Sequence, residues 1–423
     1  MRFLRSFVLT TTLILAGGYY TSEAAGFSYK AGIGYDFLSQ EYFLDSAAQE
    51  SADSVLTEWS LKTDYLDNVK GLLSFTVSPF SKRTLELTSR YEQTSDFIRL
   101  KFLSDLNTRL GKNRLDINGE LDWRKRHRGE ENFGDNYIFG YSRAKLSIPS
   151  TDGLKTIIQM QGEFVQFDSV SSTSYNYYRI GGKLGIEKLF ENFSFGDIGL
   201  TFTTRQVPDS TGLNYVDFGL VGSYFGFYDQ GELDFFGRLG RKDYNQIDGR
   251  NDFWRVEIDG RNKIRLGERN FAKQEVEFEL TDYDPTDPVN LDYYRLEVTI
   301  LAGFETVFFT VGIGPEFEAL HEAKDDFAVS EDYVEIGAKI DLDYIKAGRL
   351  FLAAESVLGK RDLKDNNELI TDYTFERINL IGDFKIFKGL SLSVLFSAEW
   401  EWHQIATNDS EIYLLSSSLT YGL

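Results

Sequence analysis

Acidic and basic side chains that alternate with apolar ones are the residues of this 423-residue chain best suited to chemistry. From Trp254 to Leu266 the charged residues fall on odd positions, and the apolar ones fall on even positions. So dense a row requires water or paired counter-charges, because isolated charges are costly to bury. It predicts either a wetted wall that acts on polar solutes or a salt-bridge network that fills the space. The row and its expected partners on the next strands are Arg255, Glu257, Asp259, Arg261, Lys263, Arg265, Glu275, Glu277, Glu279, Arg295 and Glu297.

The three histidines, His127, His321 and His403, are the candidate acid–base groups. No Gly-x-Ser-x-Gly elbow, His-Glu-x-x-His motif or complete phosphate-binding glycine loop accompanies them. Loops commonly contain histidine without any catalytic role. We therefore expect no catalytic residue, and an enzyme that uses these histidines is the alternative.

Two acidic stretches offer oxygen ligands of the kind that Ca²⁺ or Mg²⁺ prefers. Neither contains the glycine and final glutamate of an EF-hand loop, and the chain has no cysteine. We expect solvated acidic loops here, with no dedicated metal site and no cofactor. The residues concerned are Asp282, Asp284 and Asp287 in one stretch and His321, Glu322, Asp325 and Asp326 in the other.

The elements that position these residues are predicted to be β-strands. Successive strand residues point to opposite faces of a sheet, so an apolar and polar alternation of period two indicates a strand. The pattern covers the chain after the first residues. Clear examples are 27–37, 115–123, 252–266 and 390–402.

The connections between these strands alternate between short and long, which predicts hairpins with one compact end and one elaborated end. This arrangement is typical of transmembrane β-barrels, in which apolar side chains face lipid and polar ones face the lumen. β-Sandwiches or a solenoid are the soluble alternative, but no linker and no fixed-length repeat is apparent. The short connections are predicted at 266–271, 302–306, 345–349 and 387–389, and the long ones at 241–252, 282–292, 321–332, 360–372 and 403–411.

The first 24 residues have the features of a signal peptide. Arg2 and Arg5 precede the apolar run 7–18, and Ser22 and Ala24 provide small residues for cleavage after Ala24. We therefore expect a signal peptide at 1–24 and a single barrel domain at 25–423, with a membrane anchor as the alternative. The net charge of −21 argues against a nucleic-acid partner.

The last residues, "YLLSSSLTYGL", resemble the C-terminal signal of bacterial outer-membrane β-barrel proteins, which the barrel assembly machinery recognises. Alternate residues match that signal, although Ser417 interrupts the series and the family usually ends in phenylalanine. The resemblance implies export to the outer membrane of a Gram-negative cell and contact with its lipid and lipopolysaccharide. It indicates no subfamily. The matching residues are Tyr413, Leu415, Leu419, Tyr421 and Leu423.

These observations predict an all-β, antiparallel up-and-down transmembrane barrel of roughly 20 strands, with 18 to 22 allowed. About 15 strands should follow Asp135, whereas 55–108 is ambiguous, because the stretch 55–77 could be one long strand or a hairpin. Strand patterning begins at Phe27, which leaves no room for an N-terminal plug domain. We expect a porin-like channel for passive diffusion of small hydrophilic solutes or ions. A structural or adhesive barrel with a sealed lumen is a further alternative, and the oligomeric state is undetermined.

Overall fold

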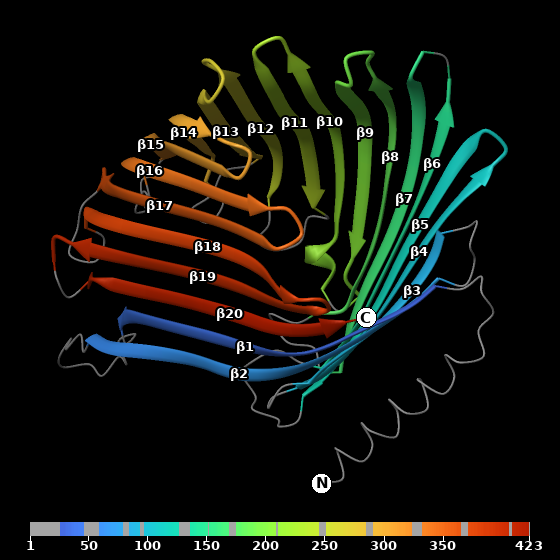
Figure 1. Ribbon diagram of the computed structural model, residues 1–423, viewed down its shortest axis with the longest axis horizontal. Helices are drawn as coiled ribbons and strands as arrows, with labels where there is room; N and C mark the ends of the chain where they lie inside the picture. Colours follow the sequence, from blue (N-terminus) through green and yellow to red (C-terminus); the bar gives the residue numbers. More distant parts are fainter. Residues whose placement is uncertain are drawn as a thin grey trace, which may run out of the picture.

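The structure is a computed structural model that describes residues 26–45, 59–78, 84–93, 97–126, 136–150, 152–168, 175–208, 210–244, 251–284, 291–323, 332–364, 371–405 and 408–422. These residues form one sheet of 20 strands (Figure 1). Among them, no helix has the length and apolarity to cross a membrane. The only helix in the described ranges is the 3-10 turn η1 (Thr211–Leu213).

Alternation of apolar and polar residues accounts for the strands, and their bounds are as follows. They are β1 (Gly26–Asp45), β2 (Trp59–Ser78), β3 (Thr84–Gln93), β4 (Phe97–Leu110), β5 (Asn113–Arg126), β6 (Tyr137–Pro149), β7 (Leu154–Phe167), β8 (Tyr177–Leu189), β9 (Phe195–Gln206), β10 (Tyr215–Tyr228), β11 (Gly231–Tyr244), β12 (Asp252–Arg265), β13 (Asn270–Asp284), β14 (Tyr293–Glu305), β15 (Phe309–Glu322), β16 (Tyr333–Lys346), β17 (Leu350–Leu363), β18 (Tyr373–Phe387), β19 (Leu390–His403) and β20 (Ser410–Gly422). Fifteen of them follow Asp135, as predicted.

The order of the strands is cyclic. Each strand pairs antiparallel with its neighbours in sequence, and β1 also pairs with β20, from Lys30 opposite Gly422 to Glu41 opposite Glu411. Pairing between the first and last strands satisfies backbone groups that hydrocarbon could not. The predicted up-and-down antiparallel barrel of roughly 20 strands is therefore confirmed.

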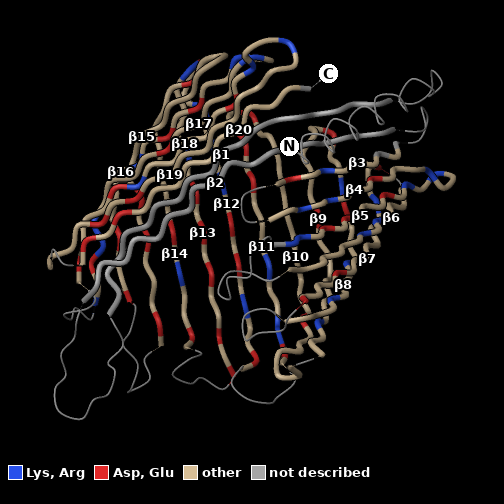
Figure 2. Tube along the Cα trace, turned by 90° about the horizontal axis from the view of Figure 1, so that it is seen from below, with Lys and Arg blue, Asp and Glu red and all other residues tan. Residues whose placement is uncertain are grey.

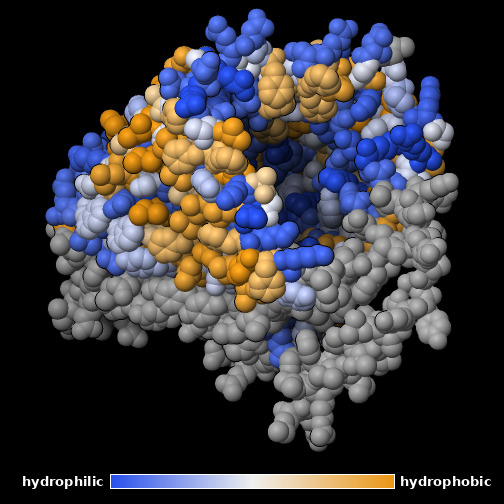
Figure 3. Space-filling view, viewed as in Figure 1, coloured by the Kyte–Doolittle hydropathy of each residue, from blue (hydrophilic) through white to orange (hydrophobic). Residues whose placement is uncertain are grey.

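The two faces of the sheet differ as the sequence predicts. Large apolar side chains stay exposed on one face, such as Ile180 and Leu184 of β8 and Ile336 of β16, which are 56%, 56% and 61% exposed. Figure 3 shows such residues gathered over β16–β20, beside a hollow lined with hydrophilic residues. An apolar face this extensive is unfavourable in water and suits lipid.

Connections alternate in length around the sheet. Two residues join β18 to β19 and three join β16 to β17, whereas nine residues, 364–372, separate β17 from β18. The short turn predicted at 302–306 is misplaced, because β14 continues to Glu305 and the turn lies at 306–308. Gly303, within the predicted turn, permits a close approach inside the strand, where a Cβ atom would lie 2.2 Å from Phe271 and 2.3 Å from the Val311 carbonyl.

The stretch that could have been one strand or a hairpin is one strand, the 20-residue β2. It pairs with β1 over its whole length but with β3 only over Gly71–Val77. Within the described residues, Trp59–Lys70 thus has β1 as its sole strand neighbour.

A pair of residues recurs at the start of β6, β8, β10, β12, β14, β16 and β18, each of which follows a long connection. The first member is Asn or Asp, and the second is Tyr or Phe, as in Asn214-Tyr215 and Asp252-Phe253. The Asx side chain accepts a hydrogen bond of 2.6–2.8 Å from a backbone N–H within one residue of the end of the preceding strand, before β8, β10, β12, β14, β16 and β18. The aromatic members lie at 137, 177, 215, 253, 293, 333 and 373, so the repeat has a spacing of 38 to 40 residues. The sequence reading missed this repeat, whose spacing is nearly but not strictly regular.

Candidate functional site

The predicted charged residues lie together on one face of β12, β13 and β14. On β12 they alternate with Trp254 and Ile258, which are 42% and 37% exposed on the other face. Figure 2 shows acidic and basic residues interspersed along these strands. All eleven residues, from Arg255 to Glu297, occupy this face by strand parity.

Ion pairs between strands that are not neighbours show that this face is concave. Lys273 Nζ of β13 lies 3.1 Å from Asp341 Oδ2 of β16, although β14 and β15 run between them. Three strand spacings span about 14 Å on a flat sheet. Lys263 of β12 likewise contacts Glu305 of β14. Only side chains that converge inside a curved sheet can meet in this way, so the charged face is the inner wall of the barrel.

Some of the predicted residues form ion pairs. Arg255 Nη2 lies 2.6 Å from Glu279 Oε1, and Arg261 Nε lies 2.7 Å from Glu275 Oε1. Arg295 contacts Glu297 at 3.1 Å and Glu318 of β15 at 2.6 Å. In the described ranges, Arg265 has no ion pair.

Directly opposed positions on β12 and β13 mostly carry like charges. Glu257 faces Glu279, Asp259 faces Glu277 and Lys263 faces Lys273. Arg261, in contrast, faces a residue of opposite charge, Glu275. The ion pair of Arg255 with Glu279 is therefore diagonal.

One row of carboxylates crosses four neighbouring strands. Asp259 faces Glu277, Glu277 faces Glu297 and Glu297 faces Glu318. No cation among the described residues lies within 4.0 Å of Asp259 or Glu277. We call these four residues the acidic row. A hollow of about 300 Å³ lies along it. Like charges directly opposite one another are destabilising, and the cost falls to a small value only in a hydrated, high-dielectric setting.

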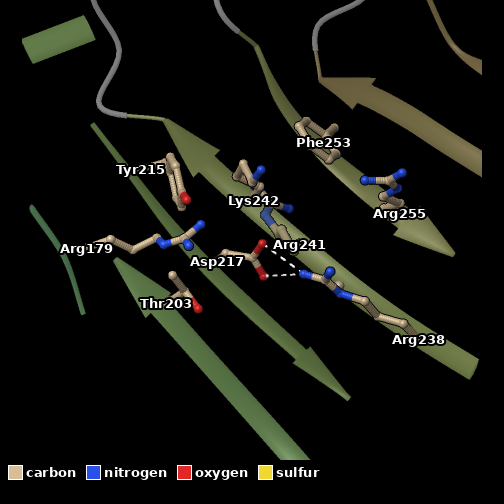
Figure 4. A pocket seen from close by; sticks show the side chains of 10 residues that line it. Arg179, Thr203, Tyr215, Asp217, Arg238, Arg241, Lys242, Phe253 and Arg255 are labelled. Atoms are coloured by element: carbon tan, nitrogen blue, oxygen red, sulfur yellow. Dashed lines mark hydrogen bonds and ion pairs between the residues drawn. The ribbon is translucent and has the colours of Figure 1, made fainter. Parts of the chain in front are cut away.

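A second hollow, of about 230 Å³, lies on the inner wall formed by β8–β12 (Figure 4). We call it the basic hollow. The sequence reading missed it, although the same alternation places its residues on the inner face. The side chains that define it are Arg179, Tyr215, Asp217, Arg238, Lys242 and Arg255.

Most cations of the basic hollow have a carboxylate partner. Arg238 Nη2 donates to both oxygens of Asp217, at 3.0 and 3.2 Å. Arg179 contacts Glu163 of β7, and Arg255 contacts Glu279. Lys242 instead lies over two aromatic rings, 4.7 Å from the centroid of Tyr215 and 5.2 Å from that of Phe253. Both rings belong to the repeated Asx-aromatic pairs, which therefore position the hollow.

The two histidines that the structure describes lie apart, on β15 and β19. His321 Nδ1 lies 2.9 Å from Asp332 Oδ2 on the loop side of β15, and its ring lies tilted against Tyr294, with ring centroids 5.1 Å apart. His403 Nδ1 lies 3.0 Å from the hydroxyl of Thr371, a residue only 4% exposed, so no substrate can reach that oxygen. His127 lies outside the described residues.

The acidic stretches are only partly described. Within the described ranges, no three His, Asp or Glu residues are grouped so that they could hold a metal ion. Asp282 and Asp284 lie at the end of β13, and His321 and Glu322 at the end of β15. Asp287, Asp325 and Asp326 fall outside the described residues.

The residues that resemble an assembly signal lie on β20. Tyr413, Leu415, Leu419 and Tyr421 share one face of that strand and alternate with Ser416 and Ser418. Tyr413 accepts a hydrogen bond of 2.6 Å from Trp400 Nε1 on β19. Leu423 and the expected signal peptide 1–24 fall outside the described residues.

Comparisons with known proteins relate this chain to others by fold. No protein-family model and no curated protein matches the sequence. Among solved structures, the copper transporter OprC aligns with a TM-score of 0.56 and 9% identity, over 96% of this chain and 81% of that one. A ferric enterobactin receptor mutant (PfeA) from Pseudomonas aeruginosa aligns with a TM-score of 0.54 and 9% identity, over 95% and 81%. OpdQ from the same organism aligns with a TM-score of 0.49 and 12% identity, over 94% and 98%. The likeness to the first two shows that the chain has the fold of outer-membrane β-barrel proteins.

Proposed function

We propose that this chain is a porin-like channel of the bacterial outer membrane, through which small hydrophilic solutes diffuse passively. The acidic row is the observation that carries the proposal. Carboxylates directly opposite one another are tolerable where water screens them, and at 4 Å two unit charges interact by only about 1 kcal/mol in bulk water. The acidic row therefore supports a hydrated lumen more than a sealed one.

The number of strands, 20, agrees with this proposal. A barrel of about 16 to 18 strands leaves an aqueous channel unless a loop or domain fills it, and the diameter grows with strand number. The charged inner face would act as the pore wall. Arg255, Glu257 and Arg261 are among its residues, and their acidic and basic neighbours would provide a transverse field for polar solutes.

An enzyme is less well supported. His321 and His403 lie on different strands, β15 and β19, and the hydroxyl beside His403 is buried.

The proposal includes the route to the membrane. We expect the signal peptide to be removed after Ala24, the barrel assembly machinery to insert the chain, and the long connections to face lipopolysaccharide. Intact-mass analysis of protein extracted from outer membranes tests the first step. A mature chain that begins at Ala25 agrees with it, and retention of Met1 contradicts export by this route.

Recording from purified, refolded protein in a planar lipid bilayer tests the channel itself. We expect stepwise conductance in KCl that persists without any added ligand. A barrel that inserts, shows heat-modifiable mobility on a gel and yet conducts no current has a sealed lumen, which would refute the proposal.

A further inference from the structure

The basic hollow contains more positive charge than its carboxylates neutralise. Arg179, Arg238 and Arg255 each contact a carboxylate, as described above. Two cations remain, Lys242 of β11, which lines the hollow, and Arg205 of β9, whose guanidinium lies over the Tyr215 ring of the hollow and donates to the Leu213 carbonyl and the Tyr175 hydroxyl. In the described part of the chain, neither has a carboxylate within 4.0 Å.

Both cations contact the same aromatic ring. The guanidinium carbon of Arg205 lies 4.6 Å from the centroid of Tyr215, and Lys242 Nζ lies 4.7 Å from that centroid. Arg205 is also directly opposite Arg179 in the register of β8 and β9, so two positively charged residues occupy adjacent positions on the wall. Cation–π contacts offset part of the repulsion, but they leave the positive charge in place.

Lysines elsewhere on the inner wall differ in this respect. Lys183, Lys263 and Lys339 each contact a carboxylate, from Asp197, Glu305 and Glu316 respectively. Lys242 is directly opposite an acidic residue, Asp217 of β10. However, Arg238 donates hydrogen bonds to both oxygens of the Asp217 carboxylate. Lys242 therefore differs from these three lysines in having no carboxylate partner in the described residues.

We infer that the basic hollow binds a small oxyanion, a carboxylate or a phosphate, between Lys242, Arg205 and Arg238. An anion there would neutralise both unpaired cations. Arg238 would add a directional donor, since its buried Nε–H has no hydrogen-bond acceptor in the described residues. Guanidinium groups match the geometry of carboxylate and phosphate oxygens. The hollow of about 230 Å³ has room for such an ion with water, since one water occupies about 30 Å³ of liquid.

This inference rests on the proposed function in one respect, because a solute must be able to enter the lumen. Binding and conduction are nevertheless separate measurements. Isothermal titration calorimetry of the full chain, folded in neutral detergent, measures binding without any current. The probes are sodium acetate and sodium phosphate, each compared with sodium chloride at the same ionic strength.

The variants are Lys242→Met and Arg205→Met, with Lys183→Met as the matched control. Each removes one positive charge from the same wall, but Lys183 lies outside the basic hollow and is paired with Asp197. We expect wild-type protein to bind at least one probe, and each hollow variant to bind it about tenfold more weakly, as expected for the loss of one charge-assisted contact. The control should bind as the wild type does. Arg205→Met keeps the test valid if Lys242→Met fails to fold.

The outcomes separate the two proposals. Binding of acetate alone identifies a carboxylate site, and binding of phosphate alone identifies a phosphate site. Absence of binding to both probes, or equal weakening in the Lys183→Met control, overturns the oxyanion site even if the barrel conducts. A barrel that binds a probe but passes no current overturns the channel and leaves the site intact.

Discussion

Two substitutions on β13, Glu277→Gln and Glu275→Gln, should change the stability of the barrel in opposite directions. Both residues lie on the inner face of the same strand, two positions apart, and both changes remove one negative charge with little change in shape. Glu277 faces Asp259 on one side and Glu297 on the other. Glu275 instead contacts Arg261 at 2.7 Å and Lys273 at 3.2 Å.

The magnitudes follow from these contacts. Each opposed like-charge pair costs about 0.5 kcal/mol, so Glu277→Gln should raise the free energy of unfolding by about 1 kcal/mol. Each partly exposed ion pair contributes about 0.5 kcal/mol, so Glu275→Gln should lower the free energy of unfolding by about 1 kcal/mol. The two variants should therefore differ by about 2 kcal/mol.

Urea unfolding of protein refolded in lipid vesicles measures the difference as a shift in midpoint. Repeating it in 1 M NaCl provides a control, because screening then acts over about 3 Å and should reduce both effects. Equal destabilisation by both variants would contradict the reasoning, since it would mean that the carboxylate of Glu277 has a stabilising partner or is not ionised.

Three further changes test other parts of the structure. Converting Glu275, Glu277 and Glu279 to glutamine should shift the reversal potential of the channel in a KCl gradient toward anion selectivity, because nearby Arg and Lys lose their counter-charges. An unchanged reversal potential would mean that these three glutamates do not line the conduction path. Tyr421→Ala should lower barrel assembly in cells, measured by heat-modifiable mobility, whereas Thr420→Ala on the other face of β20 should not. Asp292→Ala should destabilise the barrel by about 1 kcal/mol, because the Tyr283 N–H loses its acceptor at 2.7 Å; a urea midpoint equal to that of the wild type would argue against the capping role.

The sequence was sufficient for the architecture because the period-two pattern records which face each side chain occupies. The pattern from Trp254 to Leu266 identified both the strand and its charged face, and the alternating connections indicated a barrel. Gly303 shows where such reading fails. A glycine that admits Phe271 across the ladder looks the same in sequence as a glycine that forms a turn.

The two hollows could not be derived in the same way, because they depend on register. Asp259, Glu277 and Glu297 become a row only when the pairing of three strands is known. Likewise, Lys242 lies opposite Asp217, and only the structure reveals that Arg238 takes that carboxylate. The Asx-aromatic repeat, in contrast, was visible in the sequence. It is easily overlooked, because only two residues recur in each copy and the loops between copies differ in composition.

The Asx-aromatic repeat has a consequence for how barrels of this kind change size. One repeat, such as residues 252–291, contains two strands and ends just before the next capping residue, Asp292. Gain or loss of one repeat would bring an equivalent Asx to the backbone N–H of the preceding strand and keep the number of strands even. The chain could thus widen or narrow its lumen in steps of one hairpin, each altering the diameter by about a tenth, because diameter grows roughly linearly with strand number. Duplication or deletion of a short stretch of gene would be enough for each step.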